Sequence, residues 1–186
     1  MEHRDHVALI KAGVEGLSAS NTWADLGAGA GAFTLALADC LGGNGTIYAV
    51  DQDRRVLDEQ ARLMRSRFPA INAHYLTANF TRRLDLPPLD GVVMANSLHF
   101  ERQKEVVLQL VRSYLKPGGR LILVEYNVDQ GNAWVPYPLS YGTWEKLARQ
   151  QGFVNTKLVG KRTSRFLDEM YAAVSYWQPL HAPSPS

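Results

Sequence analysis

The sequence predicts one α/β domain built around a mostly parallel sheet, and three stretches carry this prediction. Residues 22–33, TWADLGAGAGAF, run from an apolar strand through three glycines into a helical segment. The segment TIYAVDQD predicts a second strand that ends at Asp51. Residues 121–124, LILV, are too continuously apolar for a strand with one face in water, which indicates a strand covered on both faces.

The remaining elements follow from hydrophobic spacing and turn residues. Val7, Ile10, Val14 and Leu17 recur at helical spacing, so residues 5–17 are expected to form a helix that packs against the domain as a lid or flank. The other expected helices and strands, in chain order, are helix 32–40, helix 54–67, strand 70–77, strand 89–95, helix 101–115, helix 144–151, strand 153–159 and strand 169–177.

The glycines at positions 27, 29 and 31 predict a ligand loop, because they leave no side chains between the backbone N–H groups and a ligand. Their GxGxG spacing differs from the GxGxxG of dinucleotide enzymes, and Asp25 precedes it. A carboxylate there would repel a pyrophosphate but accept hydrogen bonds from an amino group. This pattern favours a zwitterionic ligand, and the alternative is an ordinary glycine-rich turn.

This segment closely resembles motif I of the class I S-adenosylmethionine-dependent methyltransferases, an acidic residue followed by GxGxG. The resemblance implies that Gly27, Gly29 and Gly31 border the methionine part of S-adenosylmethionine, whose product is S-adenosylhomocysteine. Asp25 and Ala28 are placed with them as cofactor-binding residues.

Asp51 lies twenty residues after Gly31, the spacing that brings an acidic side chain to the ribose hydroxyls of a nucleoside in a βαβ unit. The family carries its ribose-binding acidic residue at this position, and the resemblance implies that Gln52 touches the adenine. Asp53 is expected to cap the next helix. The arginines of that helix form either a solvated face, which we favour, or a nucleic-acid stripe; the net charge of +2 is too small to imply polyanion binding.

After the third strand the family commonly has an acidic residue that holds the adenine amino group, and Asn79 replaces it here, with Phe80 next to it. The amide oxygen can still accept a hydrogen bond. Asn96 follows the fourth strand and is also assigned to the cofactor. Pro87 and Pro88 precede this strand, unlike the proline pair that DNA and glutamine N-methyltransferases carry after it, which argues against amino groups of nucleic acid bases as substrates.

His99 is expected at the carboxyl edge of the sheet, where open α/β sheets bind ligands. It either accepts a proton from a substrate hydroxyl, amine or carbon acid, or only lines the pocket. Methyl transfer needs chiefly alignment and exclusion of water, so both roles stay open. His3 and His6 lack a third ligand nearby, and no metal site is predicted.

Residues 127–143 form the least regular part of the chain and leave the carboxyl end of the buried strand. Their aromatic side chains, Trp134, Tyr137 and Tyr141, are predicted to bind the substrate, and the alternative is that they pack beneath a surface loop. The last two strands match the final hairpin of the methyltransferase sheet. The resemblance therefore implies a Rossmann-like, seven-stranded, mostly parallel sheet with an antiparallel last strand and helices on both faces.

We expect a single domain over residues 1–178, with a flanking helix within residues 1–19 and a disordered tail at 179–186. One cysteine and the lack of a long apolar run predict a cytoplasmic protein without a membrane span, as a monomer or homodimer. The expected function is transfer of a methyl group from S-adenosylmethionine to a small molecule. The alternatives are an inactive S-adenosylmethionine-binding or S-adenosylhomocysteine-binding protein and a NAD(P)-binding oxidoreductase.

Overall fold

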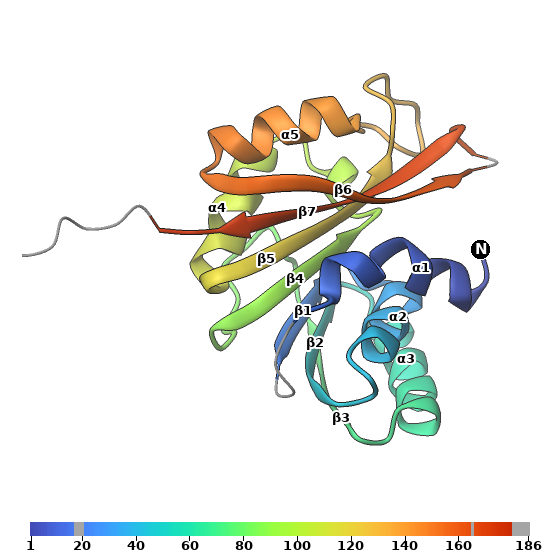
Figure 1. Cartoon of the computed structure of the whole chain (residues 1–186). Helices are drawn as coiled ribbons and strands as arrows, with labels where there is room; N and C mark the ends of the chain where they lie inside the picture. The colour runs from blue at the N-terminus through green and yellow to red at the C-terminus, as the bar shows by residue number, and fades with distance from the viewer. Residues whose placement is uncertain (17–20, 165, 180–186) are drawn as a thin grey trace, which may run out of the picture.

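The computed structural model describes residues 1–16, 21–164 and 166–179. A seven-stranded sheet runs through these residues in the order β3-β2-β1-β4-β5-β7-β6 (Figure 1). The strands are β1 (Thr22–Leu26), β2 (Gly45–Asp51), β3 (Ile71–Thr77), β4 (Leu89–Ala95), β5 (Leu115–Tyr126), β6 (Phe153–Thr163) and β7 (Glu169–Trp177). The helices are α1 (His3–Val14), α2 (Ala32–Cys40), α3 (Arg54–Arg67), α4 (Lys104–Tyr114) and α5 (Tyr141–Gln150), with a 3-10 turn, η1 (Leu98–Phe100).

The strand directions confirm the predicted fold class. The pairs β1–β2, β1–β4, β2–β3 and β4–β5 are parallel, whereas β7 is antiparallel to both β5 and β6. The strand order reverses between β1 and β4, because the chain winds outward to β3 and then returns to the other side of β1. A reversal of this kind leaves a crevice at the carboxyl ends of the strands, where ligands of such sheets bind.

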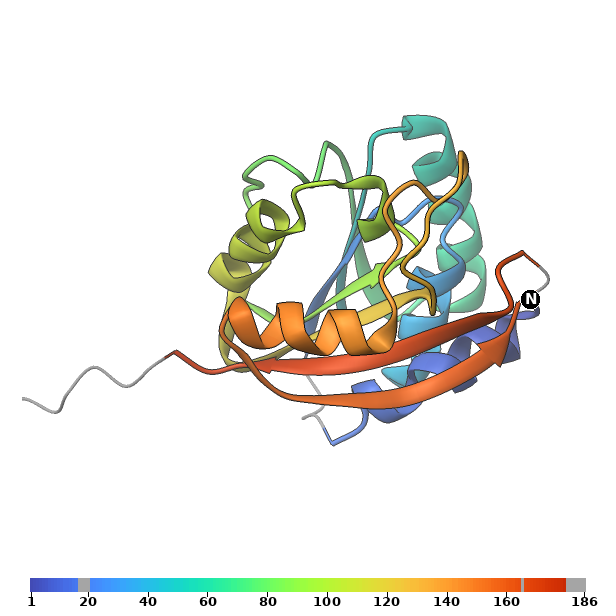
Figure 2. The ribbon, with the colours of Figure 1, turned by 90° about the horizontal axis from the view of Figure 1, so that it is seen from above.

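Helices cover both faces of the sheet, as Figure 2 shows from above. Helices α1, α2 and α3 pack on one face, where Trp23 and Ile122 point. Helices α4 and α5 pack on the other, where Leu26 and Leu123 point. Because side chains of a strand alternate between faces, the two cores use alternate residues of the same central strands.

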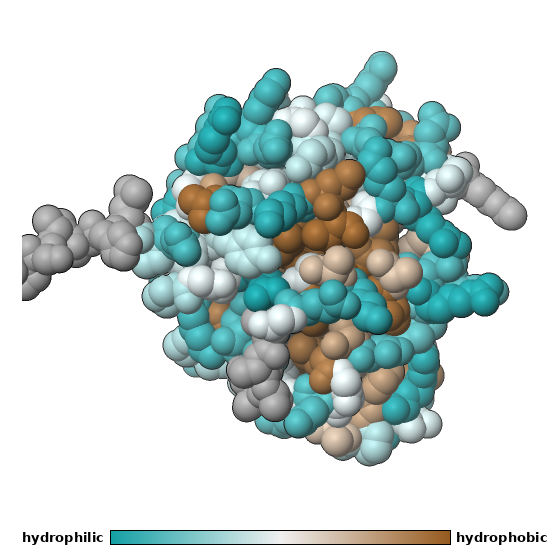
Figure 3. Space-filling view, viewed as in Figure 1, coloured by the Kyte–Doolittle hydropathy of each residue, from teal (hydrophilic) through white to brown (hydrophobic). Residues whose placement is uncertain are grey.

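The N-terminal helix lies beside the β6–β7 hairpin, and the Asp5 carboxylate pairs with the Arg162 guanidinium at 2.8 Å (Figures 1 and 2). On the face viewed in Figure 3, apolar residues gather near the middle and polar residues surround them. Helix α1 ends at Val14, three residues before the predicted end, and Gly16 has a left-handed φ of 82°. The predicted flank beyond residue 16 and the predicted tail beyond residue 179 lie outside the described residues.

Other boundaries differ from the sequence prediction as well: α5 begins at Tyr141, three residues before the predicted start, and β6 extends to Thr163, four residues past the predicted end. Helix α4 begins at Lys104, three residues after the predicted start, because residues 101–103 link η1 to the helix without helical backbone. Pro117, Gly118 and Gly119 are typical turn residues, yet they lie inside β5, where the pairing with β4 shifts from Leu89–Leu115 to Gly91–Arg120. The extra residues of β5 bulge out of the ladder, so the turn chemistry of Pro117 and Gly118 produces an irregular strand and not a break.

Candidate functional site

The glycine loop turns tightly around the tip of β2. The N–H groups of Gly27 and Ala28 both donate to the Val50 carbonyl at 2.9 Å, and the Gly31 N–H donates to the Ala28 carbonyl at 2.9 Å. The N–H groups of Gly27, Gly29 and Gly31 were predicted to be open to a ligand, yet all three donate hydrogen bonds within the protein, that of Gly29 to the Asp51 carboxylate. The reason is that the loop closes against the neighbouring parallel strand, which leaves its carbonyl within reach of the turning backbone.

Gly29 is the glycine that leaves space. Its φ of 52° lies in the left-handed region, and an added Cβ would meet no atom within 4 Å among the described residues. A Cβ at Gly27 would instead meet the Ser97 side chain at 2.5 Å, and one at Gly31 would collide with the Gln60 side chain. Gly27 and Gly31 therefore allow the loop to pack, whereas Gly29 borders open volume.

Asp51 ties the glycine loop to the start of α3. Its Oδ2 accepts a hydrogen bond from the Gly29 N–H at 2.8 Å, and its Oδ1 accepts one from the Asp53 N–H at 2.9 Å. Each carboxylate oxygen keeps a second lone pair that can accept a further hydrogen bond. Asp53 caps α3 by accepting from the Arg55 N–H at 2.9 Å, which confirms that prediction.

Asp25 is a buried carboxyl at the bottom of the loop. Its Oδ2 accepts a hydrogen bond from the Thr34 hydroxyl at 2.5 Å. Burial raises the pKa of this carboxyl to about 7, the Thr34 bond lowers it, and the nearby Asp51 carboxylate raises it further. The protonation state of Asp25 therefore changes near neutral pH.

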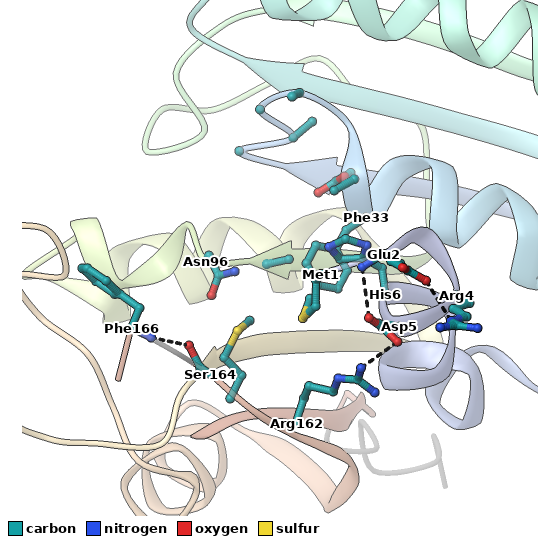
Figure 4. A pocket seen from close by; sticks show the side chains of 18 of the residues that line it. Met1, Glu2, Arg4, Asp5, His6, Phe33, Asn96, Arg162, Ser164 and Phe166 are labelled. Carbon is teal, nitrogen blue, oxygen red and sulfur yellow. Dashed lines mark hydrogen bonds and ion pairs between the residues drawn. The ribbon is translucent and has the colours of Figure 1, made fainter. Parts of the chain in front are cut away.

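A pocket of about 880 Å³ opens beside the glycine loop (Figure 4). Its wall comes from the loop, the end of β4, the start of α1 and the tip of the β6–β7 hairpin. The predicted cofactor residues that line it are Asp25, Gly27, Ala28, Gly29 and Asn96. The other predicted site residues are not part of its wall: Gly31, Asp51, Gln52, Asn79, Phe80, His99, Trp134, Tyr137 and Tyr141.

Asn96 has the features of a ligand-binding residue. Its φ of 52° is unusual for a residue with a side chain, and its N–H donates to the Val124 carbonyl at 2.8 Å. Its Oδ1 is buried and has no hydrogen-bond partner within the described part of the chain. A buried unpartnered carbonyl oxygen is costly, which makes this atom a candidate acceptor for a ligand.

The segment after β3 lies against the tip of β2, because the Ala78 N–H donates to the Asp51 carbonyl at 2.9 Å. The side-chain oxygen of Asn79 accepts from the Thr81 N–H at 2.8 Å, and Phe80 is buried next to Gly27. The predicted nucleoside residues thus gather on the β2–β3 side of the glycine loop, next to the pocket and outside its wall.

His99 and Glu125 form a buried pair at the carboxyl ends of β4 and β5. The Nδ1 atom of His99 lies 2.7 Å from Oε2 of Glu125, and the His99 backbone N–H donates to Oε1 at 3.1 Å. Both side chains are almost completely inaccessible to solvent. The carboxylate fixes the orientation of the ring and leaves Nε2 as the ring nitrogen that Glu125 does not hold.

The aromatic residues of the predicted substrate loop lie apart from one another. Trp134 is 75% exposed, and the backbone N–H of Tyr137 donates to the His99 carbonyl at 2.9 Å. The Lys104 ammonium lies 5.7 Å from the centre of the Tyr137 ring. Tyr141 begins α5 and contacts the Tyr171 ring at 5.8 Å. Tyr137 therefore fastens the loop next to His99, while Tyr141 contributes to the core.

Sequence reasoning missed three contributors to this site. Glu125 appeared only as the end of an apolar strand, although a lone carboxylate directly after four buried apolar residues is a usable signal. Phe166 at the hairpin tip and the first turn of α1 also line the pocket. Their approach depends on β7 running antiparallel beside β5 and on the Asp5–Arg162 ion pair, neither of which a local pattern contains.

No group of His, Cys, Asp and Glu side chains in the described ranges is arranged to hold a metal ion. His3 pairs with Asp39 at 2.9 Å, and the His6 ring packs edge-on against Phe33. Over the same residues, no helix combines the length and the apolar character that crossing a membrane requires.

The sequence matches the family described as "Methyltransferase domain" over residues 24–121, which is more than half of the chain. Among curated proteins it is similar to the reducing polyketide synthase grgA of Penicillium sp, with 26% identity over 164 residues. That match covers 73% of this chain and 6% of the synthase, so the chain spans a small part of this relative's length.

Two solved structures share the fold. One is a 1,6-didemethyltoxoflavin-N1-methyltransferase of Burkholderia thailandensis with bound 1,6-didemethyltoxoflavin and S-adenosylhomocysteine; it is 18% identical with a TM-score of 0.73, covering 95% of this chain and 78% of that one. The other is the CurJ carbon methyltransferase, 19% identical with a TM-score of 0.69, covering 86% of this chain and 49% of that one. Together with the family match and the sheet order, they show that this chain belongs to the class I S-adenosylmethionine-dependent methyltransferase family.

Proposed function

We propose that this protein binds S-adenosylmethionine at the glycine loop and transfers its methyl group to a small-molecule acceptor. The observation that carries the proposal is the open volume beside Gly29, at the point where the strand order reverses and where the Asp51 carboxylate holds the loop. Ligands of open α/β sheets bind at such a reversal. The pocket of about 880 Å³ at this point is in the size range of small-molecule sites.

The residues present fit this cofactor. Asp51 keeps one free lone pair on each carboxylate oxygen for the two ribose hydroxyls. The unpartnered Oδ1 of Asn96 faces the pocket as an acceptor for an ammonium group, and the space next to Gly29 takes the methionine part. Gln52, Asn79 and Phe80 are assigned to the adenine because their segments lie beside Asp51.

When bound, S-adenosylmethionine supplies an electrophilic methyl group attached to a sulfonium. The protein has to align the acceptor with that methyl group, exclude water and remove the acceptor's proton. We propose that Nε2 of His99 accepts the proton of the methyl acceptor, because Nδ1 is held by Glu125. Glu125 acts on the acceptor only through His99 and is a positioning residue. The same pair would stabilise the protonated ring that forms when His99 accepts the proton.

For the acceptor, we propose a carbon acid, in which a C–H next to a carbonyl loses its proton as the new carbon–carbon bond forms. A hydroxyl or an amine can react through a lone pair that is already present, whereas a carbon acid requires a base. The buried His99–Glu125 pair suits this requirement. Two similar proteins support it by their names alone: one is a carbon methyltransferase and the other is a polyketide synthase.

The test is a product analysis with S-adenosylmethionine carrying a ¹³C-labelled methyl group. The protein is incubated separately with a 1,3-diketone, a catechol and a primary amine, and mass spectrometry with ¹³C NMR locates the label. We expect the label on the diketone carbon, and we expect His99→Asn to lower that rate by about 10²–10⁴. Label on catechol or amine only, with His99→Asn fully active, would exclude the carbon acid. Binding of S-adenosylhomocysteine without methylation of any acceptor would favour the inactive binding protein.

A further inference from the structure

An exposed aromatic ring lies in the wall of the pocket. Phe166, at the tip of the β6–β7 hairpin, is 49% exposed and lines the cavity. A phenylalanine ring left half in water at a concave site is a surface that a ligand can cover. In the view of Figure 4, Phe166 lies at one end of the pocket and the Asp5–Arg162 pair lies toward the other.

Hydrogen bonds near the end of the hairpin hold the backbone on either side of the Phe166 ring. The Ser164 N–H donates to the Asp168 carbonyl at 2.6 Å, and the Phe166 N–H donates to the Ser164 hydroxyl oxygen at 3.1 Å. Asp168 closes the turn with a φ of 51°, in the left-handed region. Because short polar side chains tolerate this conformation, the turn forms without a glycine.

A line of rings connects Phe166 with His99. The Phe166 ring lies 5.8 Å from the Tyr126 ring, and the Tyr126 ring lies 6.1 Å from the His99 ring. Tyr126 is the residue after Glu125 at the end of β5, and it pairs across the sheet with Met170, which is buried and also lines the pocket. Phe166 and Met170 line the pocket, whereas Tyr126 is not part of its wall and contacts the rings of both Phe166 and His99. We call Phe166, Tyr126 and Met170 together the apolar surface.

We propose that this surface selects the methyl acceptor, and that it favours a flat, conjugated or aromatic one. The inference rests on the proposed function, because it names the class of acceptor for that reaction. Aromatic rings attract flat π-systems by stacked or edge-to-face contact in addition to burying apolar area. The charged side chains near the start of α1, Asp5 and Arg162, offer no such surface. Trp134, Tyr137 and Tyr141 do not line the pocket. Of the two phenylalanines that do, Phe33 is buried and Phe166 is half exposed, so Phe166 is the phenyl ring that an acceptor can cover.

The test compares two diketone probes that differ in one ring: benzoylacetone, which is flat and aromatic, and 1-cyclohexylbutane-1,3-dione, which is saturated at the ring. Both are titrated by calorimetry into protein saturated with S-adenosylhomocysteine. We expect benzoylacetone to bind at least five times more tightly to the wild type. Phe166→Leu keeps an apolar side chain but removes the ring, so it should abolish this preference. Tyr126→Leu should reduce the preference in the same direction.

Leu63→Ala is the matched control, because Leu63 is 47% exposed on α3 and does not line the pocket. It should leave both probe affinities within twofold, and all variants should bind S-adenosylhomocysteine like the wild type. An unchanged preference in Phe166→Leu would overturn the inference, as would failure of both probes to bind. Failure of the wild type to bind S-adenosylhomocysteine would instead remove the proposed function, so the two outcomes are distinguishable.

Discussion

Replacement of Asp25 by asparagine tests the electrostatics of the glycine loop without any ligand. The folded protein raises the pKa of this buried carboxyl from 3.8 to about 7, chiefly through burial. At 1.36 kcal/mol for each pKa unit, this amounts to about 4 kcal/mol of lost stability once the pH exceeds 7. Asparagine has nearly the same shape, can accept the Thr34 hydrogen bond through its oxygen, and carries no charge.

The sign of the pH dependence follows from which state holds the proton. The folded protein keeps Asp25 protonated to higher pH than the unfolded chain, so the stability that this proton contributes is complete below the unfolded pKa and disappears as the pH rises through about 7. Asp25→Asn does not lose it. The free energy of unfolding of the variant should therefore rise relative to that of the wild type by about 3 kcal/mol between pH 5 and pH 8. This is less than the value of about 4 kcal/mol for the whole pKa shift, because the measurement starts at pH 5 and not at the unfolded pKa.

Urea or thermal unfolding of both proteins at pH 5, 6, 7 and 8 measures this difference. For a chain of this length, the gap between the melting temperatures should widen by roughly 6–12 °C. Thr34→Val provides a second comparison: it removes the hydrogen bond that lowers the pKa of Asp25, so its stability should continue to fall above the pH at which the wild type levels off. A gap between Asp25→Asn and wild type that stays constant within about 0.5 kcal/mol would show that Asp25 is ionised throughout.

Three further predictions concern the ligand. Asp51→Ala should weaken S-adenosylhomocysteine binding by about 1.5–3 kcal/mol in calorimetry, because hydrogen bonds to a charged acceptor are of that size; an affinity within twofold of wild type would remove Asp51 from the site. Gly29→Val should abolish the rise in melting temperature that the ligand causes while the fold survives. Gly31→Ala should instead lower the melting temperature of the free protein, because its Cβ collides with Gln60. Equal ligand-induced shifts in wild type and Gly29→Val would contradict the assignment of Gly29. In steady-state kinetics, Glu125→Gln should lower kcat and leave the S-adenosylmethionine KM unchanged, because Glu125 acts only through His99; a change confined to KM would mean that the pair serves binding.

The fold could be predicted because its signals are local. The glycines around Gly29 adopt left-handed φ values, and Asp51 ends its strand as the spacing indicated. The turn residues Pro117, Gly118 and Gly119 are a local signal as well, yet pairing with β4 includes them in β5. Hydrogen bonding to a neighbouring strand can therefore keep turn-type residues within a strand when the extra residues form a bulge.

The sequence could predict the part of the site that consecutive residues form, which is the glycine loop. The pairing of His99 with Glu125 and the approach of Phe166 to Tyr126 join distant parts of the chain, and no spacing rule contains them. The loop after β5 shows the opposite difficulty. Its aromatic residues lack a periodic pattern, so nothing in the sequence determines whether Trp134 points into the pocket or into solvent, and it is exposed.

The central claim is that the glycine loop binds S-adenosylmethionine and not a dinucleotide, and calorimetry with two ligands tests it most directly. The wild-type protein is titrated with S-adenosylhomocysteine and, separately, with NAD⁺ under the same conditions. We predict saturable one-to-one binding of S-adenosylhomocysteine and no measurable binding of NAD⁺, because carboxyl groups at Asp25 and Asp51 adjoin the loop and an ionised carboxylate repels a pyrophosphate. Binding of NAD⁺ with no binding of S-adenosylhomocysteine would contradict the account.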